Sequence, residues 1–292
     1  MTRIVETLAE ISAPYDALLC DLWGCVHDGE KPLTEAVAAL REFRAAGKDR
    51  KVILITNAAR QKAAVAADLD RIGLPRDTWD DIASSGDTAR AAMFRGAVGA
   101  KVWFIGEPRD DVFFEPMPEV ADAVAIERVA LEQAEGIVCT GPFDAQADPE
   151  VLRPQLLWAK QNGLKLLCAN PDVVVDRGEV RDWCAGAVAG LYEEMGGESL
   201  YFGKPQPAIY DLARTRLANV GGTIDPSRIL AIGDGIRTDI KGALGEDLDS
   251  LFITGGLAAE DTGTIRQPDP AKLEKFIAIE MVTPTFAAGF LR

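Results

Sequence analysis

Short apolar runs alternate with helix-length segments along most of the chain, and this alternation is the strongest constraint on its fold. The pattern opens with a strand predicted over residues 17–22, a helix over 34–47, a strand over 51–56 and a helix over 60–73. Further strands are predicted at 101–105, 136–140, 164–169, 200–202, 228–232 and 250–253, and further helices at 149–162, 184–195 and 207–218. Strands separated by helices pair in parallel, with helices on both faces of the sheet. We therefore predict an α/β protein built on doubly wound parallel sheets.

The length of the chain leaves room for two domains, because 292 residues is nearly twice the usual size of one. The segment from about 87 to 181 contains strands and helices of its own, so we predict that it forms an inserted α/β domain. The remaining residues, 1–86 and 182–292, would then form the core domain.

Composition excludes several classes of function. The net charge of −15 gives an acidic surface, which repels nucleic acid and anionic lipid, so neither is an expected partner. No apolar run approaches the length of a transmembrane helix, and the first residues lack the pattern of a signal peptide, so a cytoplasmic location is predicted. The five cysteines form no CxxC pair, and the chain has a single histidine. Carboxylates must therefore hold any metal ion.

Polar residues stand directly after four of the apolar runs, where the ends of parallel strands form ligand sites. These residues are Asp21, Thr56 with Asn57, Lys204 and Asp234, with Asp239 one helical turn further on. Taken singly, each is an ordinary helix cap, turn former or solvated charge. Together they supply a carboxylate nucleophile, donors for phosphate oxygens, a lysine and acidic ligands for Mg²⁺, which is the set that phosphoryl transfer needs.

Four motifs in these positions resemble those of the haloacid dehalogenase superfamily, in the same order. They are Asp21-Leu22-Trp23-Gly24, Ile55-Thr56-Asn57, Gly203-Lys204-Pro205 and Gly233-Asp234-Gly235-Ile236-Arg237-Thr238-Asp239-Ile240. The distance from Thr56 to Lys204, the Gly106-Glu107 pair, the Asn170-Pro171-Asp172 turn and Thr254-Gly255-Gly256 resemble class IIA, the NagD-like phosphatases. The resemblance implies a doubly wound core, a C2-type cap formed by the inserted domain, and Mg²⁺-dependent hydrolysis of a small phosphorylated metabolite.

The resemblance also implies a role for each motif residue. Asp21 would be the nucleophile that forms an aspartyl-phosphate, while Thr56, Asn57 and Lys204 would hold the transferring phosphate. The ligands of Mg²⁺ would be Asp21, the backbone carbonyl of Trp23 and Asp234, with Asp239 positioning a metal-bound water or Lys204. The turn that contains Asn170 and Asp172 would face the substrate, although Asn-Pro-Asp is also an excellent plain turn. A homo-oligomer is compatible with the sequence, which gives no oligomeric state.

One position departs from the family pattern. The family's phosphatases carry a second aspartate two residues after the first, which acts as an acid on the leaving group and then as a base on water. Here that position is Trp23. Because acid-base assistance is worth about 10²–10⁴ in rate, its loss predicts weak turnover. The alternative function is a phosphate-binding or regulatory protein with impaired turnover; a dehalogenase is disfavoured by the acidic fourth motif.

Three further residues allow two interpretations each. Trp23 is either a structural plug or a platform for an aromatic substrate. His27 could replace the missing acid, or it could be a loop histidine bonded to backbone, which is the more common case. Arg237 could contact phosphate or bridge to an acidic neighbour.

Overall fold

The computed structural model describes residues 2–177 and 180–292 and divides the chain into two compact units. The first unit comprises the described residues up to Thr56 together with Ala66–Ala83 and Lys204–Arg292. The second comprises Asn57–Val65 and Ser84–Gly203. Among the described residues, no helix has both the length and the apolar character needed to cross a membrane.

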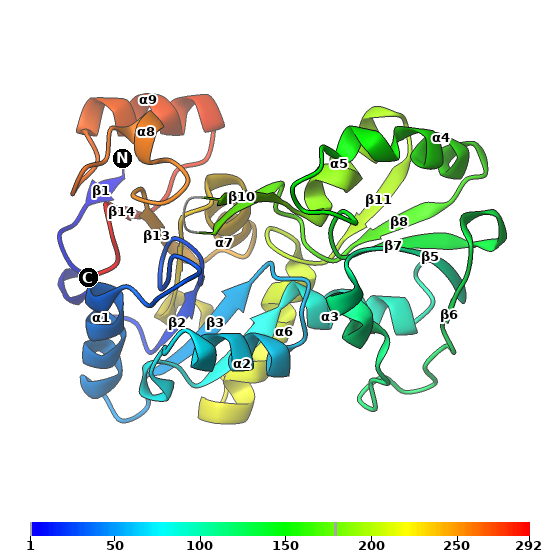
Figure 1. The fold of residues 1–292 in the computed structure, drawn as a ribbon. Helices are drawn as coiled ribbons and strands as arrows, with labels where there is room; N and C mark the ends of the chain where they lie inside the picture. The colour runs from blue at the N-terminus through cyan, green and yellow to red at the C-terminus, as the bar shows by residue number, and fades with distance from the viewer. Residues whose placement is uncertain (1, 178–179) are drawn as a thin grey trace. The chain divides into compact units, whose positions relative to one another are not determined.

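The first unit is built on a seven-stranded sheet with the order β1-β14-β13-β12-β2-β3-β4 (Figure 1). Its strands are β1 (Arg3–Ile4), β2 (Ala17–Cys20), β3 (Lys51–Thr56), β4 (Asp81–Ser84), β12 (Ile229–Gly233), β13 (Asp249–Ile253) and β14 (Phe286–Ala288). The central strand β2 pairs in parallel with β12 on one side and β3 on the other, with Cys20 opposite both Ile232 and Leu54. The carboxyl ends of these three strands therefore meet at one edge of the sheet.

The helices of the chain outside the inserted segment pack against this sheet through apolar side chains. They are α1 (Thr34–Ala45), α2 (Lys62–Arg71), α6 (Pro207–Gly221), α7 (Lys241–Gly245), α8 (Ala259–Thr262) and α9 (Pro270–Glu280), with 3-10 turns η1 (Leu8–Glu10), η2 (Arg76–Thr78) and η6 (Pro226–Arg228) and the π turn η7 (Ile236–Ile240). Ile209, Tyr210 and Leu217 of α6 share a buried cluster with Ala17 and Leu19 of β2. Burial on both faces explains why these strands are continuous apolar runs.

The second unit has a five-stranded parallel sheet with the order β11-β8-β7-β5-β6. Its strands are β5 (Lys101–Ile105), β6 (Glu127–Arg128), β7 (Gly136–Cys139), β8 (Lys165–Cys168) and β11 (Glu198–Tyr201), beside the antiparallel hairpin β9 (Val174–Arg177) and β10 (Val180–Trp183). Its helices are α3 (Ser85–Phe94), α4 (Arg153–Gln161) and α5 (Ala185–Glu194), with 3-10 turns η3 (Pro108–Phe114), η4 (Leu131–Gln133) and η5 (Pro149–Leu152).

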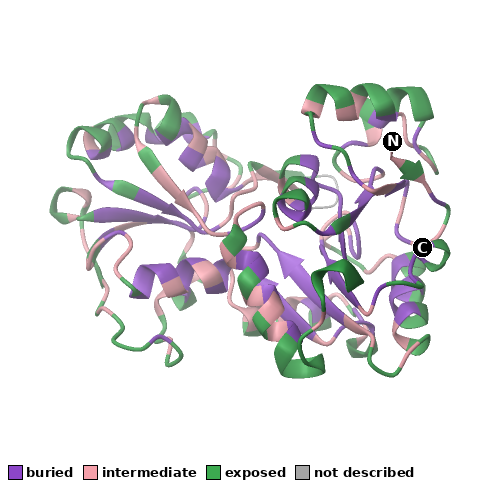
Figure 2. Ribbon diagram, turned by 180° about the vertical axis from the view of Figure 1, so that it is seen from behind, coloured by how far each residue is buried: buried purple, intermediate pink, exposed green. Residues whose placement is uncertain are grey.

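Alternate residues of the strands in the second unit point to opposite faces of the sheet. Ile137 and Cys139 pack with α4 and α5, whereas Val138 between them packs with α3. Figure 2 shows buried residues concentrated in the strands and exposed residues on the outer turns of the helices. The prediction of an α/β fold with parallel sheets and a cap, made from the alternation of elements and the family resemblance, is confirmed.

The limits of the second unit differ from the sequence-based limits of the inserted domain. The sequence indicated residues 87–181, whereas the second unit runs from Ser84 to Gly203 and also includes Asn57–Val65. The physical reason is that β11 pairs with β8, so the strand predicted at 200–202 extends the sheet of the second unit rather than that of the core. The helix α3 was not predicted; it begins where Ser84 accepts a hydrogen bond from the Asp87 N–H.

Candidate active site

The carboxylate of Asp21 stands at the end of the central strand of the first unit. Its backbone N–H donates to the Ile232 carbonyl at 2.8 Å, which continues the pairing of β2 with β12 by one residue. The residue is only 6% exposed. A buried carboxylate must be hydrogen-bonded or paired with a cation to remain charged, and Lys204 provides that pairing.

The ammonium group of Lys204 connects two of the predicted site residues. Its Nζ lies 2.5 Å from Asp21 Oδ1 and 2.8 Å from Asp239 Oδ1, and it also donates to the Ile55 carbonyl at 3.2 Å. Lys204 is buried with 2% exposure. The lysine is therefore held between the carboxylate that follows β2 and the Asp239 carboxylate in the turn after β12, beside the end of β3.

Glycines leave the space that the Asp234 carboxylate occupies. Asp234 follows β12 directly, and a Cβ atom at either Gly24 or Gly256 would collide with its Oδ2. Gly24 also has a φ of +70°, which side chains other than glycine rarely adopt. Oδ2 accepts a hydrogen bond of 3.1 Å from the Leu257 N–H. The two glycines allow the backbone to surround this carboxylate closely.

A π turn returns Asp239 to the end of the strand that precedes it. In η7, both the Asp239 N–H and the Ile240 N–H donate to the Gly235 carbonyl, at 2.9 and 3.1 Å. The Gly235 N–H in turn donates to Asp239 Oδ2 at 3.2 Å. π turns are rare and are found frequently at functional sites. Here the turn fixes the second carboxylate that pairs with Lys204.

The site holds more negative than positive charge. Asp21, Asp234 and Asp239 are buried around the single ammonium of Lys204, so this group of four side chains would carry a net charge of −2 when fully ionised. Burial raises the pKa of the Asp234 carboxyl well above its usual range, and the charges of Asp21 and Asp239 raise it further. A bound divalent cation would compensate this charge.

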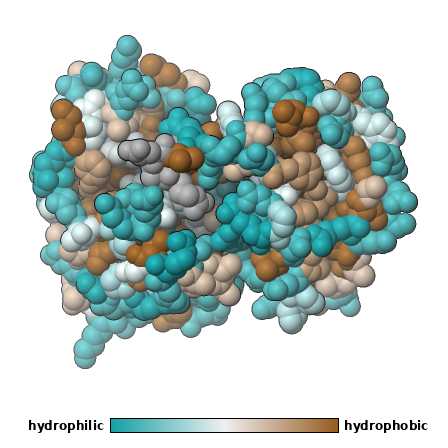
Figure 3. All heavy atoms as spheres, viewed as in Figure 1, coloured by the Kyte–Doolittle hydropathy of each residue, from teal (hydrophilic) through white to brown (hydrophobic). Residues whose placement is uncertain are grey.

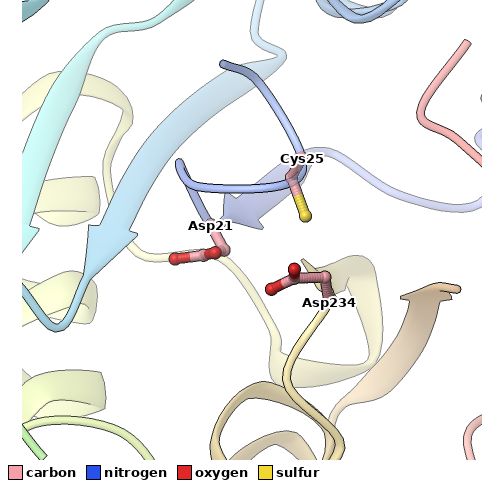
Figure 4. Close-up of side chains that lie close together, drawn as sticks. All are labelled: Asp21, Cys25 and Asp234. Atoms are coloured by element: carbon pink, nitrogen blue, oxygen red, sulfur yellow. The ribbon is translucent and has the colours of Figure 1, made fainter. Parts of the chain in front are cut away.

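Cys25, which the sequence analysis did not place in the site, is a neighbour of Asp21 and Asp234. Its Sγ and one carboxylate oxygen each from Asp21 and Asp234 lie within 4.8 Å of one another, and Figure 4 shows the Asp234 carboxylate directed toward Asp21 with the thiol beside it. Burial, followed by the charge of Asp234, raises the pKa of the Cys25 thiol well above its usual range. The thiol is therefore protonated and a poor metal ligand, as expected for a buried cysteine.

The donor set at this edge fits a hard divalent cation. Asp21 and Asp234 offer carboxylate oxygens, which Mg²⁺ and Ca²⁺ prefer to sulfur. The protonated thiol of Cys25 occupies space beside these carboxylates but adds no charge to the site. Because the carboxylates are buried close to one another, a divalent ion would also relieve the repulsion between their ionised forms. The residues present thus agree with a divalent metal site.

Trp23 and His27 pack together in the loop that follows β2. Their rings meet edge to face, with centroids 4.9 Å apart. The Trp23 ring also lies against Gly29, where a Cβ atom would collide with it. His27 is buried, and its Nδ1 accepts a hydrogen bond of 2.9 Å from the Gly29 N–H. The aromatic contacts favour the interpretation of Trp23 as a structural plug, and His27 has the bond to backbone expected of a loop histidine.

The remaining predicted residues fall in both units. Thr56 is buried at the end of β3 in the first unit. In the second unit, Asn57 Nδ2 donates to Asp172 Oδ1 at 2.9 Å, and the Asp172 N–H donates to Asn170 Oδ1 at 3.0 Å. These contacts join the residue after β3 to the Asn-Pro-Asp turn. No local sequence pattern predicts this pairing, because 115 residues separate the two partners.

Arg237 takes the second of its two proposed roles. Its guanidinium forms a two-pronged ion pair with Glu280 at 2.6 and 2.9 Å, and its side chain is 78% exposed. The residue thus bridges the loop after β12 to the end of α9.

The fold and the site together define an α/β protein that carries aspartates and a lysine at the carboxyl ends of parallel strands. Models of the haloacid dehalogenase-like hydrolases match residues 18–116 and 201–275. A solved haloacid dehalogenase-like hydrolase from Brucella suis 1330 is 36% identical, with a TM-score of 0.85 over 99% of this chain and 100% of that one. The chain belongs to the haloacid dehalogenase-like hydrolase family.

Two further comparisons concern a protein of Mycobacterium tuberculosis. Its D-glycerol 3-phosphate phosphatase is 28% identical over 257 residues, which cover 86% of this chain and 66% of that protein. This chain thus spans about two thirds of the length of that relative. A solved glycerol phosphate phosphatase from the same organism, in complex with magnesium, is 25% identical with a TM-score of 0.64 over 99% of this chain and 78% of that one.

Asp234→Asn is expected to stabilise the metal-free protein and to abolish its stabilisation by Mg²⁺. The asparagine keeps an acceptor for Leu257 but removes a buried charge that its neighbours disfavour. Each kcal/mol gained raises the melting temperature by about 2–4 °C in a protein of this size class, so a rise of a few degrees is expected in EDTA. In wild type, Mg²⁺ is expected to raise the melting temperature by mass action.

Thermal unfolding of both proteins, with and without Mg²⁺, checks this prediction. Asp261→Asn is the control, because it removes an exposed carboxylate from the same unit. A Mg²⁺-induced shift of equal size in Asp234→Asn and wild type would exclude Asp234 as a metal ligand.

Proposed function

We propose that this chain is a Mg²⁺-dependent phosphomonoester hydrolase that acts on a small phosphorylated metabolite. The observation that carries the proposal is the buried group of Asp21, Lys204 and Asp239, in which one ammonium lies 2.5 and 2.8 Å from two carboxylates, beside Asp234. The names of the relatives, which include glycerol phosphate and acid sugar phosphatases, support the same substrate class.

The carboxylate of Asp21 is the proposed nucleophile. An oxygen of Asp21 attacks phosphorus, and the bond from phosphorus to the ester oxygen breaks. The ester oxygen leaves with the bonding electron pair and takes up a proton from water. A second water then hydrolyses the aspartyl-phosphate, which releases inorganic phosphate and restores the carboxylate. Lys204 orients Asp21 by its hydrogen bond and places a positive charge beside the phosphate. Thr56 and Asn57 are the further proposed phosphate ligands, and Asn170 and Asp172 the proposed substrate residues of the second unit.

The proposed ligands of Mg²⁺ are Asp21, the backbone carbonyl of Trp23 and Asp234. Asp239 keeps Lys204 in place through the 2.8 Å ion pair, which matches one of the two roles the sequence suggested for it. When bound, the ion supplies positive charge that allows a phosphate dianion to approach a carboxylate.

Trp23 determines which leaving groups this site can expel. The indole supplies no carboxyl group to protonate the departing oxygen, and its ring packs on His27 and Gly29. A leaving group whose conjugate acid has a low pKa departs without a proton. Aryl and acyl phosphates carry such leaving groups and are therefore the favoured substrates. The same observation supports the alternative function, a phosphate-binding or regulatory protein that turns over slowly.

A screen of phosphorylated metabolites in Mg²⁺ and in EDTA tests the proposal. We expect turnover of p-nitrophenyl phosphate and of at least one small phosphomonoester in Mg²⁺, and none in EDTA. Activity that is equal in both conditions would exclude the metal-dependent mechanism. Saturable phosphate binding without turnover of any substrate would favour the regulatory alternative.

A further inference from the structure

A basic pocket lies in the first unit, at the opposite edge of the sheet from the candidate active site. It is a depression open to solvent, with a volume of about 450 Å³. The charged residues that line it are Arg41, Arg44, Lys48, Arg50, Lys51 and Asp77. Five cations around one carboxylate are unexpected in a chain with a net charge of −15.

The position of Lys51 separates this pocket from the active site. Lys51 is the first residue of β3, and Thr56 is its last. With a rise of about 3.3 Å per residue, the two ends of the strand are about 16 Å apart. An anion in the pocket is therefore bound independently of Asp21 and Lys204.

Two of the five cations are neutralised by ion pairs that also hold them in place. Arg41 makes two hydrogen bonds of 2.9 Å to the Asp77 carboxylate. Arg44 lies 2.6 Å from Asp80 and also donates to the Asp77 carbonyl. Asp80 itself accepts a hydrogen bond from the Val52 N–H at 2.8 Å. Because these ion pairs already order the two arginine side chains, little side-chain entropy remains to be lost when a ligand binds.

The other three cations leave an excess of positive charge. Arg50 lies over the Phe43 ring at 4.7 Å and donates to the carbonyls of Ser12 and Ala13. Among the described residues it forms no direct ion pair, although, beside the hydrogen bond from Arg228, its charge contributes to lowering the pKa of the Asp16 carboxyl. Within residues 2–177 and 180–292, neither Lys48 nor Lys51 forms an ion pair or a side-chain hydrogen bond. The pocket thus offers three cations, Lys48, Arg50 and Lys51, that form no direct ion pair among the described residues.

The end of helix α1 explains only part of this arrangement. The C-terminus of a helix favours a nearby cation, which accounts for Arg44 in the last turn of α1. Arg50 and Lys51 belong to the turn and strand that follow, where no such preference applies. Figure 3 shows predominantly hydrophilic side chains over the region of α1, at the lower left of the view.

We propose that this pocket binds a small anion that carries phosphate groups with two or three negative charges, such as a pyrophosphate group. The charge of such a ligand matches that of Lys48, Arg50 and Lys51, and arginine and lysine commonly bind phosphate oxygens in proteins. The net charge of the chain disfavours an extended nucleic acid as the ligand. The proposal is independent of the catalytic function.

Isothermal titration with inorganic pyrophosphate in EDTA tests the proposal. Wild type is expected to bind pyrophosphate saturably, and the double variant Lys48→Ala/Lys51→Ala about tenfold or more weakly, because two charge contacts are lost. Lys160→Ala/Lys275→Ala is the matched control, since it removes two exposed lysines elsewhere and should bind within about twofold of wild type. Hydrolysis of p-nitrophenyl phosphate should be unchanged in both double variants.

Further arms of the titration identify the ligand and locate its site. ADP in place of pyrophosphate distinguishes a nucleotide from the free anion, and citrate tests a polycarboxylate of similar charge. Binding that survives the loss of Lys48 and Lys51 but disappears in Lys204→Met belongs to the active site and overturns the proposal. The absence of saturable binding to wild type, or tighter binding of citrate than of either phosphate compound, also overturns it.

Discussion

Asp21→Ala is expected to reduce phosphomonoester hydrolysis by about 10⁴-fold or more, because removal of a covalent nucleophile leaves no atom to accept the phosphoryl group. The fold should persist. Lys204 keeps its 2.8 Å ion pair with Asp239 and its hydrogen bond to the Ile55 carbonyl, so the buried ammonium still has a carboxylate partner. The loss of one negative charge also reduces the repulsion on Asp234.

Steady-state kinetics and beryllofluoride binding measure this effect separately. Beryllofluoride mimics a phosphoryl group on aspartate, so it should bind wild type and not Asp21→Ala. Asp16→Asn is the control, because Asp16 lies just before the other end of β2 and pairs with the exposed side chain of Arg228. Equal beryllofluoride binding by wild type and Asp21→Ala would disprove the covalent role.

Trp23→Asp is expected to raise the hydrolysis of alkyl phosphates by up to about 10²–10⁴, because it restores a carboxyl group at the position where the family's phosphatases have one. Aryl phosphates should gain less, since nitrophenolate leaves without a proton. The variant also loses the ring that packs on His27 and Gly29. Trp23 is half-buried. Because loss of a fully buried tryptophan costs about 3–5 kcal/mol of stability, the loss here should be smaller, and melting curves must precede kinetics.

The matched control is Trp23→Asn, which has the size of the aspartate variant without its carboxyl group. A rate increase in Trp23→Asp but not in Trp23→Asn assigns the effect to proton transfer. If both folded variants hydrolyse alkyl phosphates no faster than wild type, the missing acid does not limit turnover. His27 would then be the first residue to replace, because its ring lies beside Trp23 and its Nδ1 is occupied by the Gly29 N–H.

Much of the core could be predicted from the apolar runs of the sequence, and the acidic group from the residues at the ends of those runs. Apolar runs buried on both faces identify β2, β3 and β12, and a parallel sheet brings their carboxyl ends together. The polar residues directly after them, Asp21 and Asp234, had to share that edge. For β3 even the bounds agree with the prediction.

Contacts that depend on the path of a loop could not be predicted in this way. Cys25 approaches Asp234 because the chain turns after β2, with the Val26 N–H and the His27 N–H both bonded to the Leu22 carbonyl. The two-residue strand β1 and the three-residue strand β14 are too short to show periodicity. The placement of β11 in the second sheet depends on its partner β8, which local sequence does not encode.

The order of strands in the first unit determines when its charged centre can form during synthesis. β2 and β3 leave the ribosome early, but β12, which completes the pairing of β2, comes more than 170 residues later in the chain. Lys204 is likewise 183 residues from Asp21. The continuous segment Ser84–Gly203, by contrast, contains every strand of the second sheet. On the ribosome, the charged centre is therefore assembled only after this whole segment has emerged.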